Sequence, residues 1–192
     1  MFVGQGKSEL TRFNTGTETP TVLTSHPGAK SNIHAFKAPE LNGELLVGCV
    51  IDRTRFTVFR SDGTRYVPWA DLVPPDPAHP YMISPEIFQA GGMTYFAVQM
   101  SSHSPGSLGV LPQDVDCAMW IIGLGKDAEH RVARRVDDGA VSGAKAYRFE
   151  PEVYVGANEV FLYYNIGNTL HRARTGIKVA ADSPAATKPA AN

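Results

Sequence analysis

Short runs of β-favouring residues alternate with turn residues along the chain, and no stretch repeats apolar side chains at the 3.6-residue period of a helix. The clearest run is Ser84–Gln99, in which a Ser-Pro-Glu start, a short strand, a Gly-Gly turn and a second strand follow one another. Similar patterns occupy 38–50 and 150–164, each with Pro-Glu, a Gly or Asn turn and an apolar strand. This pattern predicts an all-β protein made of repeated antiparallel units.

The repeats predict three complete units of four strands, over about 32–70, 82–137 and 147–181. The first unit has strands around Pro39-Glu40 and at 44–51, 55–60 and 64–69; the second at 86–89, 93–100, 118–124 and 131–136; the third at 152–155, 159–165, 169–174 and 177–180. The prolines of 73–80 cannot donate to a ladder, so this segment is expected to link two units. The Ala- and Pro-rich residues 182–192 are predicted to be a disordered tail after a domain of 1–181.

The N-terminal part, about 1–25, predicts an incomplete unit with strands at 1–3, 9–13 and 19–23. An offset of 160 residues aligns Leu10 with Leu170 and Arg12 with Arg172, so this unit starts at its second strand. A repeat of roughly 40 to 45 residues is typical of a β-propeller. We therefore expect either a small closed ring or a homo-oligomer in which another copy supplies the missing strand.

Two propeller families share this arrangement of residues. Ser84-Pro85-Glu86-Ile87-Phe88, followed by the apolar strand 119–124 and the Arg-rich strand 131–136, resembles the blades of family 43-type glycoside hydrolases and of TolB-like propellers. The resemblance covers about 1–180 and implies a propeller fold. The glycoside hydrolase likeness implies catalysis by paired carboxylates, with Glu86 and either Glu152 or Glu150 as the candidates.

The Pro-Glu positions supply the main candidate site. If Glu40, Glu86 and Glu152 occupy one equivalent position on three inner strands, their carboxylates meet at the same axial mouth. His34, His79 and His103 lie in nearby connections, and we include them as candidate ligand-binding residues. Such a site suits sugar hydroxyls, a cation or a basic peptide. The alternative is structural, with each Pro-Glu carboxylate capping backbone amides at the start of its strand.

Other constellations are weaker. The long segment 101–116 contains Ser101, Ser102, His103 and Asp114, but no Gly-x-Ser-x-Gly spacing accompanies them. Imidazole and carboxylate together suit zinc, yet no His-x-x-x-His spacing supports a metal site, and we predict neither metal nor cofactor. The tyrosines can stack on sugars or belong to the core; they are Tyr147, Tyr154, Tyr163 and Tyr164.

Composition narrows the function further. The net charge of −1 gives no basic footprint for nucleic acid, and no apolar run is long enough to span a membrane. Cys49 and Cys117 stand in apolar strands, which predicts small buried side chains. The first hypothesis is a binding module for a small-molecule or carbohydrate ligand. The alternatives are a glycoside hydrolase, truncated or completed by oligomerisation, and a part of a longer propeller; the sequence leaves the cellular compartment open.

Overall fold

The computed structural model describes residues 2–3, 9–105, 111–112, 115–137 and 147–179. In these residues all regular elements are strands, apart from two 3-10 turns, η1 (Pro39–Leu41) and η2 (Ala128–His130). The predicted all-β class is therefore confirmed. The predicted tail, 182–192, lies outside the described residues. Within the described ranges no helix is long and apolar enough to cross a membrane.

The strands form four antiparallel sheets in chain order. The first sheet contains β1 (Phe2–Val3), β2 (Thr11–Asn14) and β3 (Thr19–Val22). The second contains β4 (Lys30–Ala38), β5 (Glu44–Ile51), β6 (Arg55–Ser61) and β7 (Tyr66–Leu72). The third contains β8 (Tyr81–Ala90), β9 (Met93–Ser101), β10 (Cys117–Gly123) and β11 (Ala133–Arg135). The fourth contains β12 (Arg148–Val155), β13 (Glu159–Ile166) and β14 (Thr169–Lys178).

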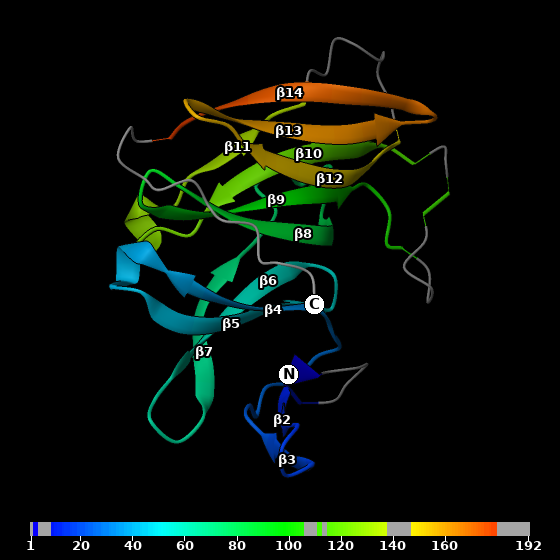
Figure 1. The fold of residues 1–192 in the computed structure, drawn as a ribbon. Helices are drawn as coiled ribbons and strands as arrows, with labels where there is room; N and C mark the ends of the chain where they lie inside the picture. Colours follow the sequence, from blue (N-terminus) through cyan, green and yellow to red (C-terminus); the bar gives the residue numbers. More distant parts are fainter. Residues whose placement is uncertain (1, 4–8, 106–110, 113–114, 138–146, 180–192) are drawn as a thin grey trace.

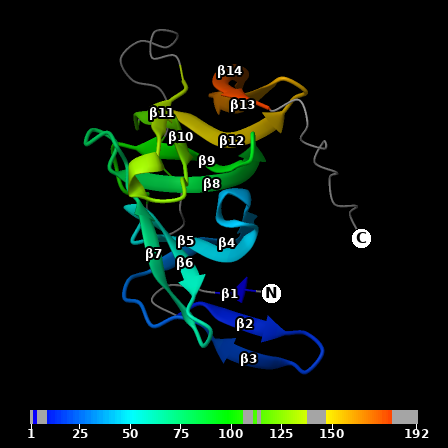
Figure 2. The same cartoon turned by 90° about the vertical axis from the view of Figure 1, so that its left-hand side faces the viewer.

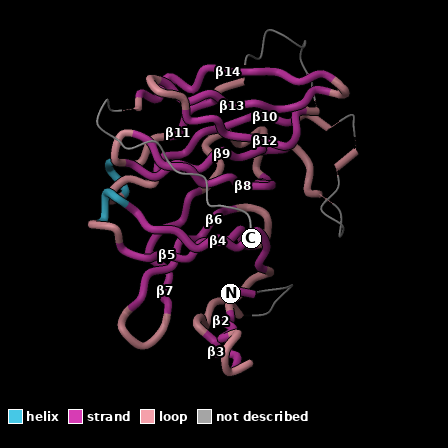
Figure 3. The backbone as a smooth tube through the Cα atoms, viewed as in Figure 1, coloured by secondary structure: helices cyan, strands magenta, loops and turns pink. Residues whose placement is uncertain are grey.

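The four sheets follow one another as a stack. Figure 1 and Figure 2 place the first sheet and the fourth sheet at opposite ends, with the second and third between them. The described sheets do not close into a ring. Figure 3 shows that loops join the strands, and that both 3-10 turns lie on the left-hand side of that view. The number of propeller blades, and a second copy that completes the first sheet, remain predictions.

The central strands are apolar on both faces because each serves two interfaces. In β5, Leu46 and Val50 face the cluster shared with the third sheet, whereas Val47 and Cys49 face the first sheet together with Leu10. In β9, Phe96 and Val98 belong to the cluster with the second sheet, and Ala97 belongs to the cluster with the fourth. Alternate side chains of a strand point to opposite faces, so one apolar run holds three layers together. Cys49 and Cys117 are buried free thiols, as predicted.

Two predicted strands are wrong. The innermost strand of the second sheet is β4, and Pro39-Glu40 lies after it in η1. Pro39 cannot donate to a ladder, and Asn42 and Gly43, with φ of 57° and 74°, turn the chain into β5. The strand thus ends before the Pro-Glu pair instead of passing through it.

The second error concerns the fourth sheet, which has three strands among the described residues instead of four. The expected strands 169–174 and 177–180 are not separate: one strand, β14, runs from Thr169 to Lys178, and residue 180 lies outside the described residues. Gly176 has a φ of 70°, and the register shifts here instead of reversing: Phe161 pairs with Arg174, and Glu159 pairs with Lys178. Thr175 stabilises this bulge because its hydroxyl donates to the Val160 carbonyl, at 2.7 Å.

Candidate functional site

Three inner strands, β4, β8 and β12, share one irregularity. Each has a register shift against its neighbour, between Ser31 and His34, between Ile83 and Glu86, and between Phe149 and Glu152. Each shift contains a residue with positive φ: 48° at Asn32, 45° at Ser84 and 54° at Glu150. The equivalent residues that follow the bulge are therefore His34, Glu86 and Glu152.

This equivalence corrects the predicted trio of glutamates, because Glu40 is not at the repeated position. Glu40 stands in η1 and reaches the third sheet, where its Oε1 accepts from the Thr94 amide at 3.0 Å and its Oε2 from the Thr94 hydroxyl at 2.9 Å. Its carboxylate caps backbone at the start of β9. Glu40 therefore has the structural role in which a Pro-Glu carboxylate caps backbone amides. In the second sheet, His34 occupies the position equivalent to Glu86 and Glu152.

His34 and Glu86 point toward the following sheet of the stack, whereas Glu152, in the fourth sheet, lies on the face turned away from the third sheet. His34 lies on the same face of β4 as Phe36, in the interface with the third sheet, and its ring hydrogen-bonds the Pro85 carbonyl. Burial lowers the pKa of His34, although the hydrogen bond to Pro85 opposes this shift. The neutral imidazole is thus favoured beside the Ser84-Pro85-Glu86 bulge.

Glu86 and Glu152 are the free carboxylates of this region. Both side chains are exposed, and neither makes a hydrogen bond or ion pair with another residue in the described part of the chain. Burial first, and then the charge of Glu152, raise the pKa of Glu86. The two carboxylates therefore interact electrostatically, and burial together with this repulsion favours the protonated form of Glu86.

Aromatic side chains cover the face of the fourth sheet that carries Glu152. Tyr154 follows Glu152 on the same face of β12 and is 58% exposed. Its cross-strand neighbour is Phe161, and Tyr163 pairs with Glu152. Arg172 lies over the Phe161 ring, with its Cζ atom 5.1 Å from the ring centroid. Tyr164 instead faces the core with the third sheet and is buried, while Tyr147 stacks on Phe149.

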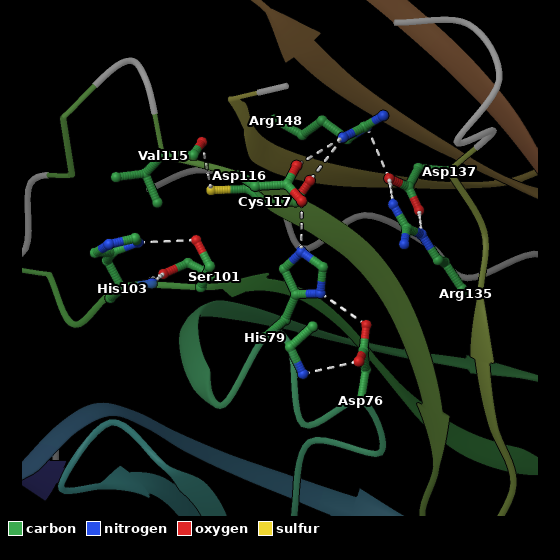
Figure 4. Close-up of polar contacts among 12 residues, drawn as sticks. Asp76, His79, Ser101, His103, Val115, Asp116, Cys117, Arg135, Asp137 and Arg148 are labelled. Carbon is green, nitrogen blue, oxygen red and sulfur yellow. Dashed lines mark hydrogen bonds and ion pairs between the residues drawn. The ribbon is translucent and has the colours of Figure 1, made fainter. Parts of the chain in front are cut away.

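His79, another predicted ligand-binding residue, lies in a buried network. Figure 4 shows its ring between two carboxylates: Asp76 Oδ2 is 2.7 Å from Nδ1, and Asp116 Oδ2 is 3.1 Å from Nε2. The hydrogen bond from His79, followed by that from the Ala78 amide, lowers the pKa of Asp76. His79, which is 4% exposed, thus connects the proline-rich linker, residues 73–80, to Asp116, directly before β10 of the third sheet.

The network continues into the fourth sheet through Arg148, which is 1% exposed. Its Nη1 donates to the Cys117 carbonyl at 2.8 Å, and its Nε is 2.7 Å from Asp137 Oδ2. Arg135 pairs with the other oxygen of Asp137 at 2.6 Å (Figure 4). Sequence reasoning missed Arg148, Asp116 and Asp137, because no local spacing connects residues that three separate segments bring together.

The third predicted histidine, His103, is exposed, and its Nδ1 lies 2.9 Å from the Ser102 hydroxyl. Ser101 bonds only to the backbone of His103 in this loop (Figure 4). Asp114 and much of the segment 101–116 lie outside the described residues. The structure therefore brings His34, Glu86 and Glu152 into one region and places Glu40, His79 and His103 elsewhere.

Within the described ranges, no group of three or more His, Cys, Asp or Glu side chains is arranged to hold a metal ion. The chemistry of the inner-strand site is thus that of two interacting carboxyls, an imidazole and exposed aromatic rings. Comparison with protein-family models, with curated proteins and with solved structures finds no match for this chain.

Proposed function

We propose that this protein is a carbohydrate-binding module whose ligand is held at the inner strands of the third and fourth sheets. Glu86 and Glu152 bind sugar hydroxyls, and Tyr154 supplies the surface on which a sugar ring stacks. The observation that carries the proposal is the placement of two carboxyls, both without a partner in the described part of the chain, on consecutive inner strands beside an exposed aromatic face.

The chemistry of the pair suits a polyol. Because burial and the charge of Glu152 raise the pKa of Glu86, this carboxyl takes up a proton more readily than an ordinary glutamate. A protonated carboxyl donates one hydrogen bond and a carboxylate only accepts, so the pair can match hydroxyl groups that do both. Tyr154 presents an apolar ring with a polar tip, which suits the apolar face of a sugar.

Affinity electrophoresis in native gels that contain xylan, arabinan or β-glucan tests this proposal. At least one polysaccharide should retard the protein, and E152Q and Y154A should each weaken that binding by about tenfold, which corresponds to about 1.4 kcal/mol. E129Q is the matched control, because Glu129 is an exposed carboxylate in η2, outside the site. The proposal fails if no gel retards the protein, or if E152Q and E129Q behave alike.

Hydrolysis of a glycosidic bond is the second candidate. It needs two carboxyls with different pKa values, and the raised pKa of Glu86 beside Glu152 favours this assignment. An assay of reducing-end release on the retained polysaccharide separates the two functions. A hydrolase would lose activity by orders of magnitude in E86Q or E152Q, whereas a binding module releases no sugar and loses affinity gradually.

The solution mass tests a third possible role for Tyr154, which is to pack against a second copy of the chain. Phe36 and Phe88 occupy the equivalent positions on β4 and β8, and both pack against the following sheet. If Tyr154 packs in the same way against another copy, light scattering will give a multiple of 20.8 kDa that falls in Y154A. A mass of 20.8 kDa in both proteins supports the assignment of Tyr154 to a ligand.

A further inference from the structure

A cavity of about 380 Å³ lies between the third and fourth sheets, at the outer strands β11 and β14. It shares no residue with the inner-strand site. Its lining residues come from or lie next to β9, β10, β11 and β14, which Figure 1 labels. Sites for small organic molecules start at roughly 300 Å³, so the volume is sufficient for a ligand of one or two rings. The residues that matter for its chemistry are Tyr95, Ile121, Val132, Arg134, Gly176 and Lys178.

The wall that belongs to the third sheet is largely apolar. Ile121 and Tyr95 face the fourth sheet, and Val132 lies just before β11. The Tyr95 ring stacks on Phe88, with 5.3 Å between the centroids and 18° between the planes, so its orientation is set by the core. Ile177 of β14 completes an apolar lining for a flat ring.

Two cations, Arg134 and Lys178, line the cavity, and the side chain of neither has a hydrogen-bond or ion-pair partner among the residues that the structure describes. Their neighbours differ: Arg135 pairs with Asp137, and Arg174 lies 3.9 Å from Glu159. The one hydroxyl side chain of β14 in the cavity, Thr175, is already used by the Val160 carbonyl and the Ile177 amide. The cavity thus combines an apolar wall with uncompensated positive charge.

Gly176 lets the Arg134 guanidinium lie against the backbone of β14. A Cβ atom at this position would come within 2.6 Å of Arg134 Nη2, and the φ of 70° disfavours any side chain. The guanidinium lies at the cavity, where its planar group of donors can bind a carboxylate through two hydrogen bonds.

We propose that this cavity binds a small aromatic carboxylate, with the ring between Tyr95 and Ile177 and the carboxylate on Arg134 and Lys178. The ligand class follows from the two halves of the lining. A neutral aromatic molecule would leave the cations without a partner, and a small inorganic anion would leave the apolar wall exposed to water. This site goes beyond the proposed carbohydrate function and is tested separately from it.

A titration of the ¹⁵N-labelled protein with 2-naphthoate, followed by NMR, tests the proposal. The amide signals of Tyr95, Gly176 and Gly91, which also lines the cavity, should shift with saturation. The neutral 2-naphthamide, which has the same rings without the charge, should bind at least tenfold more weakly. Higher ionic strength should weaken the binding of naphthoate and leave that of naphthamide unchanged. Equal affinity of the two probes, or shifts confined to other sheets, would overturn the proposal.

Variants of the two cations then test whether their charges bind the carboxylate. R134Q should lower the affinity for 2-naphthoate by at least about tenfold, because it removes the charge-assisted hydrogen bonds of the guanidinium. R172Q is the control, because Arg172 lies on the opposite face of the fourth sheet, over Phe161. If R134Q does not fold, K178Q replaces it, since Lys178 is exposed and should cost binding without affecting the core. Unchanged affinity in a folded R134Q or K178Q would refute the role of these cations.

Discussion

The inner-strand site, with His34, Glu86 and Glu152, and the buried network around His79 and Arg148 both combine histidine with carboxylates. They differ in whether the charged side chains have partners among the described residues. In the network, His79 has a carboxylate at each ring nitrogen, and Arg148 and Arg135 share Asp137. At the inner strands, the charge of Glu152 contributes to the raised pKa of Glu86, and neither carboxylate has a hydrogen-bond or ion-pair partner among the described residues. The paired, buried charges of the network are explained by their role in folding. The exposed carboxylates, of which Glu86 has a raised pKa, are instead free to interact with a ligand.

The largest effect should come from Arg148. The variant R148M removes a side chain that is 1% exposed and leaves Asp137 with only Arg135, at an expected cost of about 3 kcal/mol in the free energy of unfolding. Urea unfolding at pH 7 measures it. R172M, which removes an exposed arginine, should cost less than about 1 kcal/mol. Equal losses would mean that the network does not hold the third and fourth sheets together.

The two histidines give a sharper comparison. H79N should lower the free energy of unfolding by about 2 kcal/mol, because Asp76 and Asp116 lose their shared partner. H34N should cost less, since the His34 ring has one hydrogen bond, to the Pro85 carbonyl.

The pH dependence identifies the mechanism of the His79 effect. The hydrogen bond from His79 lowers the pKa of Asp76, so this stabilisation is complete above the ordinary Asp pKa of about 3.9 and is lost as the pH falls further. The difference between H79N and the wild type should therefore shrink below about pH 4. A difference that is constant with pH would assign the effect to packing.

The smallest effect, and the one of opposite sign, should come from Glu86. Its pKa is raised in the folded protein, by burial and then by Glu152, so the ionised carboxyl destabilises the fold at neutral pH. E86Q should raise the unfolding midpoint at pH 7, and this gain should vanish below the ordinary Glu pKa of about 4.3. Unfolding curves at pH 4 and pH 7 measure it. Destabilisation of E86Q at pH 7 would reveal a structural partner for Glu86.

The sequence identified the β class and the order of most strands because turn residues and apolar runs are local signals. It also singled out Glu86 and Glu152, since Pro-Glu recurs inside two inner strands. It misplaced Glu40 because the letters Pro-Glu are the same there, although Asn42 and Gly43 make a turn after it. The repeated feature is a backbone bulge, and Asn32-Ile33-His34 forms it without any Pro-Glu signature.

By itself, then, the sequence determined the β class, the order and approximate positions of most strands, and the recurrence of carboxylates beside prolines. The tertiary structure decided which charges are paired. Asp76, His79, Asp116, Asp137 and Arg148 are separated by up to 72 residues and meet only because the linker, β10 and β12 pack together. Hydrogen bonds and ion pairs act over a few ångströms in space, so local spacing in the chain carries no signal for them.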